Sequence, residues 1–179
     1  AGFCVGLGVP PSAIGKVYGI FKAYCTRVGS GPFPTELDDE TGETLRRNGH
    51  EFGATTGRSR RTGWLDLPAL RYTLMVNGIT DLVMMKADVM DDFPVLKVAE
   101  SYRMDGKRVE NYPDTETAEN VEPVYVEMPG WQRPLSGIRD YAALPAAFKA
   151  YVEYIGKNTG LDIKMISVGP DREETIMNA

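Results

Sequence analysis

The feature that most constrains the fold is a capped helix followed by a short apolar strand, between residues 66 and 85. Asp66 is a residue type that caps helix amino termini, Pro68 suits a first helical turn, and Asn77-Gly78 ends the pattern. Residues 82–85, Leu-Val-Met-Met, form an apolar run of the length of a buried strand. A buried strand after a helix is typical of α/β proteins, in which helices cover a mostly parallel sheet.

The rest of the chain supplies the other elements of one such domain. Further strands are predicted at residues 16–27, 124–126 and 161–166, and further helices at residues 41–48 and 144–157. The dipeptide Asp105-Gly106 predicts an antiparallel hairpin between residues 96–104 and 107–112. Loops are expected at residues 6–11, 28–32 and 115–120. Because no repeat or linker divides the sequence, we expect one α/β domain over residues 1–179, with a mixed, mostly parallel sheet, flanking helices and an antiparallel hairpin.

Composition excludes several classes of function. At 179 residues and 42% hydrophobic, the chain is long enough to bury a core. A net charge of −5 argues against general attraction to nucleic acid or anionic membranes, and no apolar run is long enough to span a bilayer. One histidine, His50, and two scattered cysteines, Cys4 and Cys25, argue against a zinc site and indicate a reducing, cytosolic setting. The chain starts at Ala1 without a methionine, so we expect a piece of a longer protein.

A glycine-spaced arginine segment, residues 53–66, indicates an anion site. Its sequence is Gly-Ala-Thr-Thr-Gly-Arg-Ser-Arg-Arg-Thr-Gly-Trp-Leu-Asp. Three glycines argue against a regular helix or strand and leave backbone N–H groups free, so we expect a loop. Two threonine hydroxyls beside Arg58, Arg60 and Arg61 offer neutral and forked cationic donors suited to carboxylates or phosphates. The alternative is a solvated basic turn, which is the usual role of a charge run.

Two polar segments follow predicted buried strands and indicate a second kind of site. Lys86-Ala87-Asp88 comes directly after residues 82–85, and residues 167–172, Ser-Val-Gly-Pro-Asp-Arg, follow the strand at 161–166. Ligands bind at the carboxyl ends of strands in open α/β sheets. Asp88 can accept two hydrogen bonds from guanine N1 and N2, with the stem of Lys86 over the ring. Taken alone, a Lys-x-Asp pair is common by chance and is more often a surface salt bridge than a ligand site.

Four motifs carry a resemblance to a known family. They are residues 22–37 (Lys-Ala-Tyr-Cys-Thr-Arg-Val-Gly-Ser-Gly-Pro-Phe-Pro-Thr-Glu-Leu), residues 53–58, residues 86–88 and residues 167–172, in this order. Together they resemble the adenylosuccinate synthetases. The resemblance covers essentially the whole chain but only the C-terminal part of the longer family chain, so the family's P-loop-type phosphate-binding element has no counterpart here. It implies that the fold is the C-terminal part of a P-loop-type nucleotide-binding fold.

The resemblance implies a reaction and its partners. Family members join IMP and L-aspartate at the expense of GTP, with Mg²⁺, in two steps: phosphorylation of the purine O6, then displacement of that phosphate by the aspartate amine. They act as cytoplasmic homodimers. The catalytic aspartate and histidine and the Mg²⁺ ligands are expected in the N-terminal part, so we assign no catalytic or metal-binding residue within this chain. We expect residues 1–179 alone to be inactive.

The resemblance also implies roles for individual residues. Thr56 and Arg58 are expected on the aspartate carboxylates, Arg58 also on the IMP ribose, and Arg60 on GTP. The implied aspartate and IMP site comprises Val28, Ala54, Thr55, Thr56, Gly57, Arg58, Ser59 and Arg60, with no separate role for Ser59. The implied GTP site comprises Arg60, Lys86, Ala87, Asp88, Ser167, Val168 and Gly169. Met85 departs from the polar residue that ordinary GTPases carry before Lys-x-Asp.

Two other functions are compatible with the same residues. The strand-end segments could serve a non-catalytic guanine-nucleotide binding module, which would not need Thr56 and Arg58 as an amino-acid clamp. A structural dimerisation fragment is the third possibility. For the ligase, we expect Arg58, Asp88 and Ser167 to share one cavity.

Overall fold

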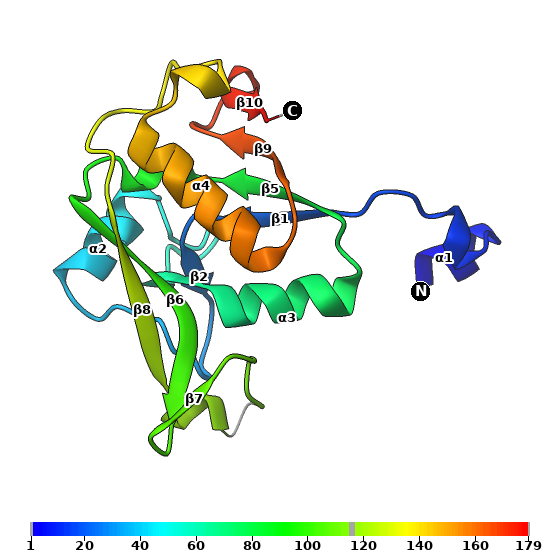
Figure 1. The fold of residues 1–179 in the computed structure, drawn as a ribbon, viewed down its shortest axis with the longest axis horizontal. Coiled ribbons are helices and arrows are strands. Elements are labelled where there is room, and N and C mark those ends of the chain that lie inside the picture. The colour runs from blue at the N-terminus through cyan, green and yellow to red at the C-terminus, as the bar shows by residue number, and fades with distance from the viewer. Residues whose placement is uncertain (1, 115–116, 179) are drawn as a thin grey trace.

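The computed structural model describes residues 2–114 and 117–178, and it is organised around a four-stranded sheet (Figure 1). The strand order is β1-β5-β9-β10. Three strands run parallel, β1 (Tyr18–Lys22), β5 (Asp81–Met85) and β9 (Ile163–Ser167), and β10 (Thr175–Met177) is antiparallel to β9. β5 is apolar and almost wholly buried, as expected for a central strand of a parallel sheet. The predicted α/β class with a mixed, mostly parallel sheet is confirmed.

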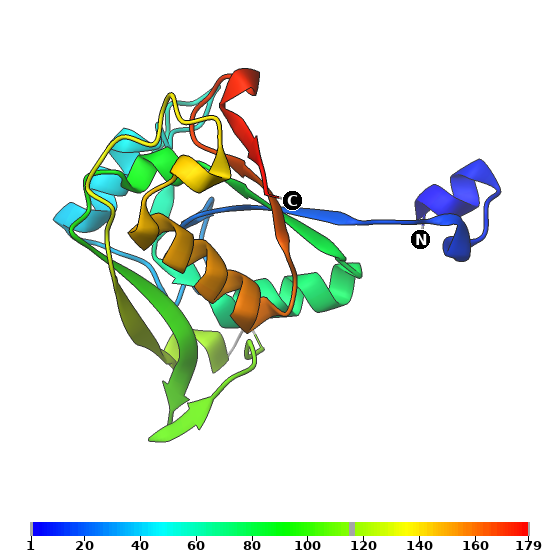
Figure 2. The same cartoon turned by 45° about the horizontal axis from the view of Figure 1, so that its top comes forward.

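Two helices pack beside this sheet and beside each other. α3 (Leu67–Asn77) and α4 (Ala146–Thr159) lie next to one another in both views (Figures 1 and 2). The Asp66 side chain caps α3 by accepting from the Ala69 N–H at 3.0 Å, and Gly78 ends it in the left-handed region at φ 59°. α4 buries Phe148, Tyr151, Val152 and Ile155 in the core. Both helices therefore form where the sequence predicted them, with α4 shifted by two residues.

A third helix and several short helical turns complete this part of the fold. α2 (Glu40–Asn48) begins after Asp39, whose carboxylate accepts from the Gly42 N–H, and it confirms the helix predicted at 41–48. Short 3-10 turns occupy Pro11–Ala13, Ala87–Met90, Thr117–Asn120, Tyr141–Ala143 and Arg172–Glu174. Within the described ranges, no helix is long and apolar enough to cross a bilayer.

A second sheet extends away from the first. Its long strand β6 (Val95–Met104) pairs antiparallel with β7 (Lys107–Val109) and β8 (Glu122–Pro129), and parallel with the two-residue β4 (Leu65–Asp66). The β6–β8 ribbon projects from the main body in Figure 1. Asp105 and Gly106 have φ values of 49° and 75°, as a two-residue hairpin turn requires, so the predicted hairpin is confirmed.

The strand predicted at residues 16–27 is wrong as one element. It is broken into β1 and β2 (Cys25–Arg27) by Ala23 and Tyr24, both almost fully buried. The Ala23 N–H still extends the ladder by donating to the Met85 carbonyl at 2.9 Å, and the chain then leaves the first sheet. An apolar run shows that a segment is extended, but it does not show where the chain changes sheets.

The expectation of a loop throughout residues 53–66 is likewise only partly correct. β3 (Arg61–Gly63) pairs antiparallel with β2, and β4 follows at once. Gly63 is in a strand because a partner backbone lies against it: a Cβ there would lie 2.3 Å from the Thr35 carbonyl oxygen. This glycine therefore permits two segments of the backbone to approach closely and does not form a turn.

The amino terminus also differs from expectation. Residues 2–7 form α1 (Gly2–Leu7), although the segment from Gly6 was expected to be a loop. The Gly8 and Val9 N–H groups donate to the carbonyls of Val5 and Cys4, and Gly8 has φ 67°. These bonds are those of a glycine-terminated helix, so Gly8 marks a helix end. α1 lies apart from the rest of the chain in both views (Figures 1 and 2). Of the loop predicted at 115–120, residues 115 and 116 lie outside the described residues.

Candidate functional site

A cavity of about 610 Å³ lies at the carboxyl ends of β5 and β9. These strands are adjacent and parallel, so the segments that follow them leave the sheet at the same edge (Figure 1). Lys86 and Asp88 line the cavity from the β5 side, and Ser167 and Gly169 line it from the β9 side. His50, at the end of α2, is exposed and lies on the rim. The two predicted strand exits therefore form one pocket.

Two non-glycine residues that line this cavity, Lys86 and His50, have a positive φ. Lys86 follows β5 directly and precedes the 3-10 turn Ala87–Met90. Its φ of 58° and ψ of 38° give a left-handed conformation that non-glycine residues rarely adopt. Its ammonium donates to the Gly49 carbonyl at 2.6 Å and to Glu51 Oε1 at 3.0 Å. The lysine is thus held at both its backbone and its head group, with 37% of the side chain exposed. Strained residues of this kind are concentrated at ligand sites.

Asp88 lies two residues beyond Lys86, in the turn Ala87–Met90. Burial is the main cause that raises the pKa of its carboxyl above the ordinary value, and the negative charge of Glu174 adds to the effect. A ligand that donates hydrogen bonds to this carboxylate would offset the cost of burying it. Ala87, between the two, is fully buried, so its side chain belongs to the core.

The β9 exit is held in shape by Glu174. Its carboxylate accepts from the Ser136 hydroxyl at 2.8 Å and from the Asp171 N–H at 3.2 Å. It also lies against Gly169, where a Cβ would be 2.0 Å from Oε2. The Ser167 hydroxyl donates to the Gly169 carbonyl at 2.8 Å. Val168 is fully buried, so this segment offers a ligand its backbone and the Ser167 side chain.

The arginine segment is an exposed loop on a closed stem. The Gly53 N–H donates to the Arg58 carbonyl at 2.8 Å, and the Gly57 N–H donates to the Gly53 carbonyl at 2.8 Å. Gly57 has φ 66°, and residues 54–59 are all exposed. The loop therefore presents Ala54, Thr55, Thr56, Gly57, Arg58 and Ser59 to solvent in a conformation set by its own backbone.

The three arginines have separate surroundings. Arg58 is on the exposed loop. Arg60 forms a 2.8 Å salt bridge with buried Glu51. Arg61 pairs with Glu36 and donates to the carbonyls of Gly29 and Gly31, so it holds the turn after β2 together. The expectation that all three arginines offer donors to one anion is therefore wrong for Arg61. Val28, in that turn, is 75% exposed.

Arg58 is not among the residues that line the cavity. The expected single cavity therefore contains Asp88 and Ser167 but does not extend to the exposed arginine loop. The link between the two regions is indirect: Arg60, at the foot of the loop, and Lys86, on the cavity wall, share the carboxylate of Glu51.

Sequence reasoning missed Glu51. It is the only residue to accept hydrogen bonds from four different side chains in the described chain, and it is fully buried. Burial by itself would raise the pKa of its carboxyl, but hydrogen bonds from these partners lower the pKa to about 2. A lysine and a tyrosine in the apolar run 16–27 were the one available indication that an acid faces this strand.

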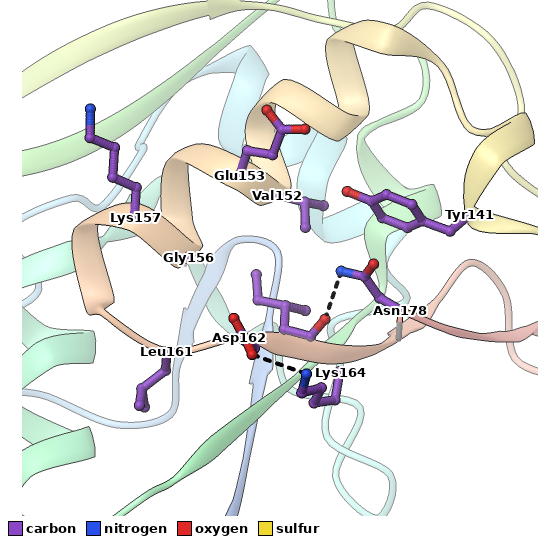
Figure 3. Close-up of a pocket in the computed structure, with 10 residues that line it drawn as sticks. Tyr141, Val152, Glu153, Gly156, Lys157, Leu161, Asp162, Lys164 and Asn178 are labelled. Carbon is purple, nitrogen blue, oxygen red and sulfur yellow. Dashed lines mark hydrogen bonds and ion pairs between the residues drawn. The ribbon is translucent and has the colours of Figure 1, made fainter.

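Figure 3 shows a second hollow, of about 290 Å³, between α4 and β9. Two of its charged groups, Lys164 and Asp162, pair with each other at 3.0 Å. The Asn178 amide donates to the Ile163 carbonyl at 2.9 Å. The hollow lies at the amino end of β9, opposite Ser167, and shares no residue with the first cavity.

The donor set offers no metal centre in the described part of the chain. In residues 2–114 and 117–178, no group of three or more His, Cys, Asp or Glu side chains is arranged to hold a metal ion.

Comparisons with known proteins point to one family. The sequence profile described as adenylosuccinate synthetase matches residues 1–176. Adenylosuccinate synthetases of Bacteroides fragilis and Porphyromonas gingivalis are 55% and 56% identical over 177 residues, which is 99% of this chain and 42% of theirs. The fully ligated adenylosuccinate synthetase from Plasmodium falciparum superimposes with a TM-score of 0.94 at 37% identity, over 99% of this chain and 43% of that one. The chain thus spans about 42% of the length of the curated relatives.

Proposed function

This chain belongs to the adenylosuccinate synthetase family, and from that premise we propose that the protein containing it joins IMP and L-aspartate at the expense of GTP. In this proposal the chain supplies the guanine pocket and the aspartate-binding loop. The observation that carries it is the cavity in which Lys86, Asp88, Ser167 and Gly169 meet at the carboxyl ends of two parallel strands.

The cavity suits a guanine base. The Asp88 carboxylate would accept from guanine N1–H and the exocyclic amine, whereas adenine has no N1–H to donate. Lys86 is anchored by its ammonium, so its aliphatic stem can lie over the ring. Ser167 and the backbone of Val168 and Gly169 would close on the base from the other strand. Asp88 is half-buried, and a base that covered its carboxylate without donating to it would leave the charge unpaired, at a cost that gives discrimination.

The exposed loop suits the two carboxylates of L-aspartate. Thr56 supplies a hydroxyl and Arg58 a guanidinium that can pair with a carboxylate in two-pronged fashion. The left-handed backbone at Gly57, with φ 66°, would let the loop approach a bound anion closely. In the proposed reaction, Arg58 also contacts the IMP ribose, Val28 approaches IMP through its backbone, and Arg60 faces GTP.

These residues bind and orient, and we assign none of them to the chemical step. Phosphoryl transfer to the purine O6 needs groups that cradle the transferring phosphate, and the aspartate amine then displaces that phosphate. Mg²⁺ neutralises phosphate charge in such reactions, but the described residues form no cluster that would hold it. We therefore expect residues 1–179 by themselves to bind substrates without turnover. Family membership further supports a cytoplasmic homodimer, and the net charge of −5 supports a protein that does not bind nucleic acid.

Base recognition is tested by Asp88→Asn in the protein that contains this chain. We expect the KM for GTP to rise about 10-fold to 100-fold. Xanthosine triphosphate should become the better substrate, because it carries an oxygen where guanine carries the amine and the new amide can donate to it. Asp92→Asn changes an exposed carboxylate nearby and should leave nucleotide preference unaltered. An unchanged preference in Asp88→Asn would remove the guanine assignment.

The aspartate loop separates a ligase from a nucleotide-binding module. Arg58→Leu should raise the KM for L-aspartate about 100-fold, with a much smaller effect on GTP binding. Arg47→Leu, an exposed arginine on α2, is the matched control. A normal aspartate KM and turnover in Arg58→Leu would favour a module that only binds a guanine nucleotide.

A further inference from the structure

One buried carboxylate, Glu51, joins the base cavity to the arginine loop. It has no solvent exposure, and its four partners come from three segments of the chain, because Lys22 and Tyr24 both lie at or just after the end of β1. Its partners are Lys22 Nζ at 2.7 Å, Tyr24 Oη at 2.7 Å, Lys86 Nζ at 3.0 Å and Arg60 Nη1 at 2.8 Å.

The two oxygens of Glu51 divide these contacts. Oε1 receives Lys22, Tyr24 and Lys86, whereas Oε2 receives Arg60. The backbone carbonyl of Glu51 also accepts from the Arg60 N–H at 2.9 Å, which closes the stem of the loop. Glu51 thus stands at the foot of the arginine loop and reaches the lysine on the cavity wall with the same side chain.

The charges do not cancel. One carboxylate faces three cations, and the side chains of Lys22, Arg60 and Lys86 keep 26%, 33% and 37% of their surface exposed. Glu51 therefore fixes where the cationic groups lie and leaves these four side chains with a net positive charge. A carboxylate that only stabilised the core could be neutralised by one cation, whereas Glu51 contacts three.

We propose that Glu51 is a positioning residue for the nucleotide: it sets the direction of Lys86 toward the base and of Arg60 toward GTP, and it couples the two. This inference rests on the proposed guanine site. It predicts that Glu51 acts through Lys86, whereas a purely structural Glu51 would act on the whole fold.

The test measures the equilibrium Kd for GTP in the protein that contains this chain, so it does not depend on turnover. Glu51→Gln should weaken GTP binding by about 10-fold or more, because an amide cannot hold three cations. The matched control is Glu36→Gln, which breaks the carboxylate pair of the neighbouring Arg61, outside the cavity, and should change the Kd for GTP less than about 2-fold.

A double-mutant cycle separates positioning from structure. In a Lys86→Met background, the fold-increase in the Kd for GTP caused by Glu51→Gln should be less than half of that in the parent protein, because the lysine that Glu51 positions is absent. Equal effects in both backgrounds would overturn the proposal. If Glu51→Gln does not fold, Tyr24→Phe removes one hydrogen bond without a change of charge and should weaken GTP binding by about 3-fold.

The outcomes are distinguishable from failure of the proposed function. A parent protein that binds GTP but forms no adenylosuccinate would contradict the ligase assignment and leave the Glu51 cycle measurable. A parent protein that does not bind GTP would contradict both. A Glu51→Gln protein that folds and binds GTP like its parent would contradict the positioning role alone.

Discussion

The hydroxyl of Tyr102 lies 2.6 and 2.7 Å from the two carboxylate oxygens of Asp66 and joins the first turn of α3 to β6. Asp66 is 4% exposed and Tyr102 is fully buried. Burial raises the pKa of the Asp66 carboxyl, while the hydrogen bonds from Tyr102 and the Ala69 N–H act in the opposite direction. Tyr102, from β6, therefore supports the buried Asp66 cap that the sequence predicts for α3.

Tyr102→Phe should lower the free energy of unfolding by about 1–3 kcal/mol, because it leaves a buried carboxylate with one partner fewer. Denaturant unfolding followed by circular dichroism measures this change. Tyr72→Phe removes the hydroxyl of a tyrosine that is 48% exposed and should change stability by less than about 0.5 kcal/mol. Equal effects of the two substitutions would contradict a structural role for the Tyr102–Asp66 contact.

Glu51 and its four hydrogen-bond partners should make the fold sensitive to acid. In the folded protein the pKa of the Glu51 carboxyl is about 2, below the ordinary 4.5. Ionisation of Glu51 therefore stabilises the fold fully above pH 4.5, and this contribution is lost as the pH falls toward 2. The loss should be on the order of 3 kcal/mol, measured as unfolding free energy against pH. Glu51→Gln should be less stable at pH 7 and should flatten that part of the curve. The exposed Glu127→Gln should keep the parent's slope, and a parent-like slope in Glu51→Gln would refute the assignment.

Two helix glycines should respond to alanine with opposite signs. In α2, a Cβ on Gly42 would lie 2.0 Å from the Leu37 carbonyl oxygen, so Gly42→Ala should destabilise the protein by about 2 kcal/mol or more. In α4, a Cβ on Gly156 would meet only the Leu161 carbonyl oxygen, at 3.4 Å. Gly156→Ala should stabilise by about 0.5–1 kcal/mol, because alanine loses less backbone entropy in a helix. Unfolding free energies of the same sign would show that close packing at Gly42 is not the deciding factor.

Gly169→Ala should weaken GTP binding through Glu174. The new methyl group would occupy the position of the Glu174 carboxylate, which holds the turn at Asp171, so we expect a Kd for GTP about 10-fold higher. Titration of the purified protein with GTP measures it. Because the clash is with one side chain, the double variant Gly169→Ala/Glu174→Ala should bind GTP no worse than Glu174→Ala alone. Additive losses would point to another cause.

Much of the local structure could be predicted because helix caps, turn residues and apolar runs mark where each element begins and ends. Asp66, Pro68 and Gly78 bound α3, Asp105-Gly106 forms the hairpin turn, and the apolar run at 82–85 becomes β5. Capping, turn conformation and hydrophobic run length act over a few residues, so neighbours in sequence suffice to read them. The segments that follow β5 and β9 could also be expected at one site, because parallel strands end at the same edge of a sheet.

The sequence by itself determined the α/β class, the capped helices, the hairpin and the four motifs that identify the family. Only the tertiary structure decided that Arg61 pairs with Glu36 while Arg60 pairs with Glu51, and that Glu51 also receives Lys22, Tyr24 and Lys86. The physical reason is that a buried charge must be paired, but which distant residues meet to pair it depends on how the strands are arranged in space.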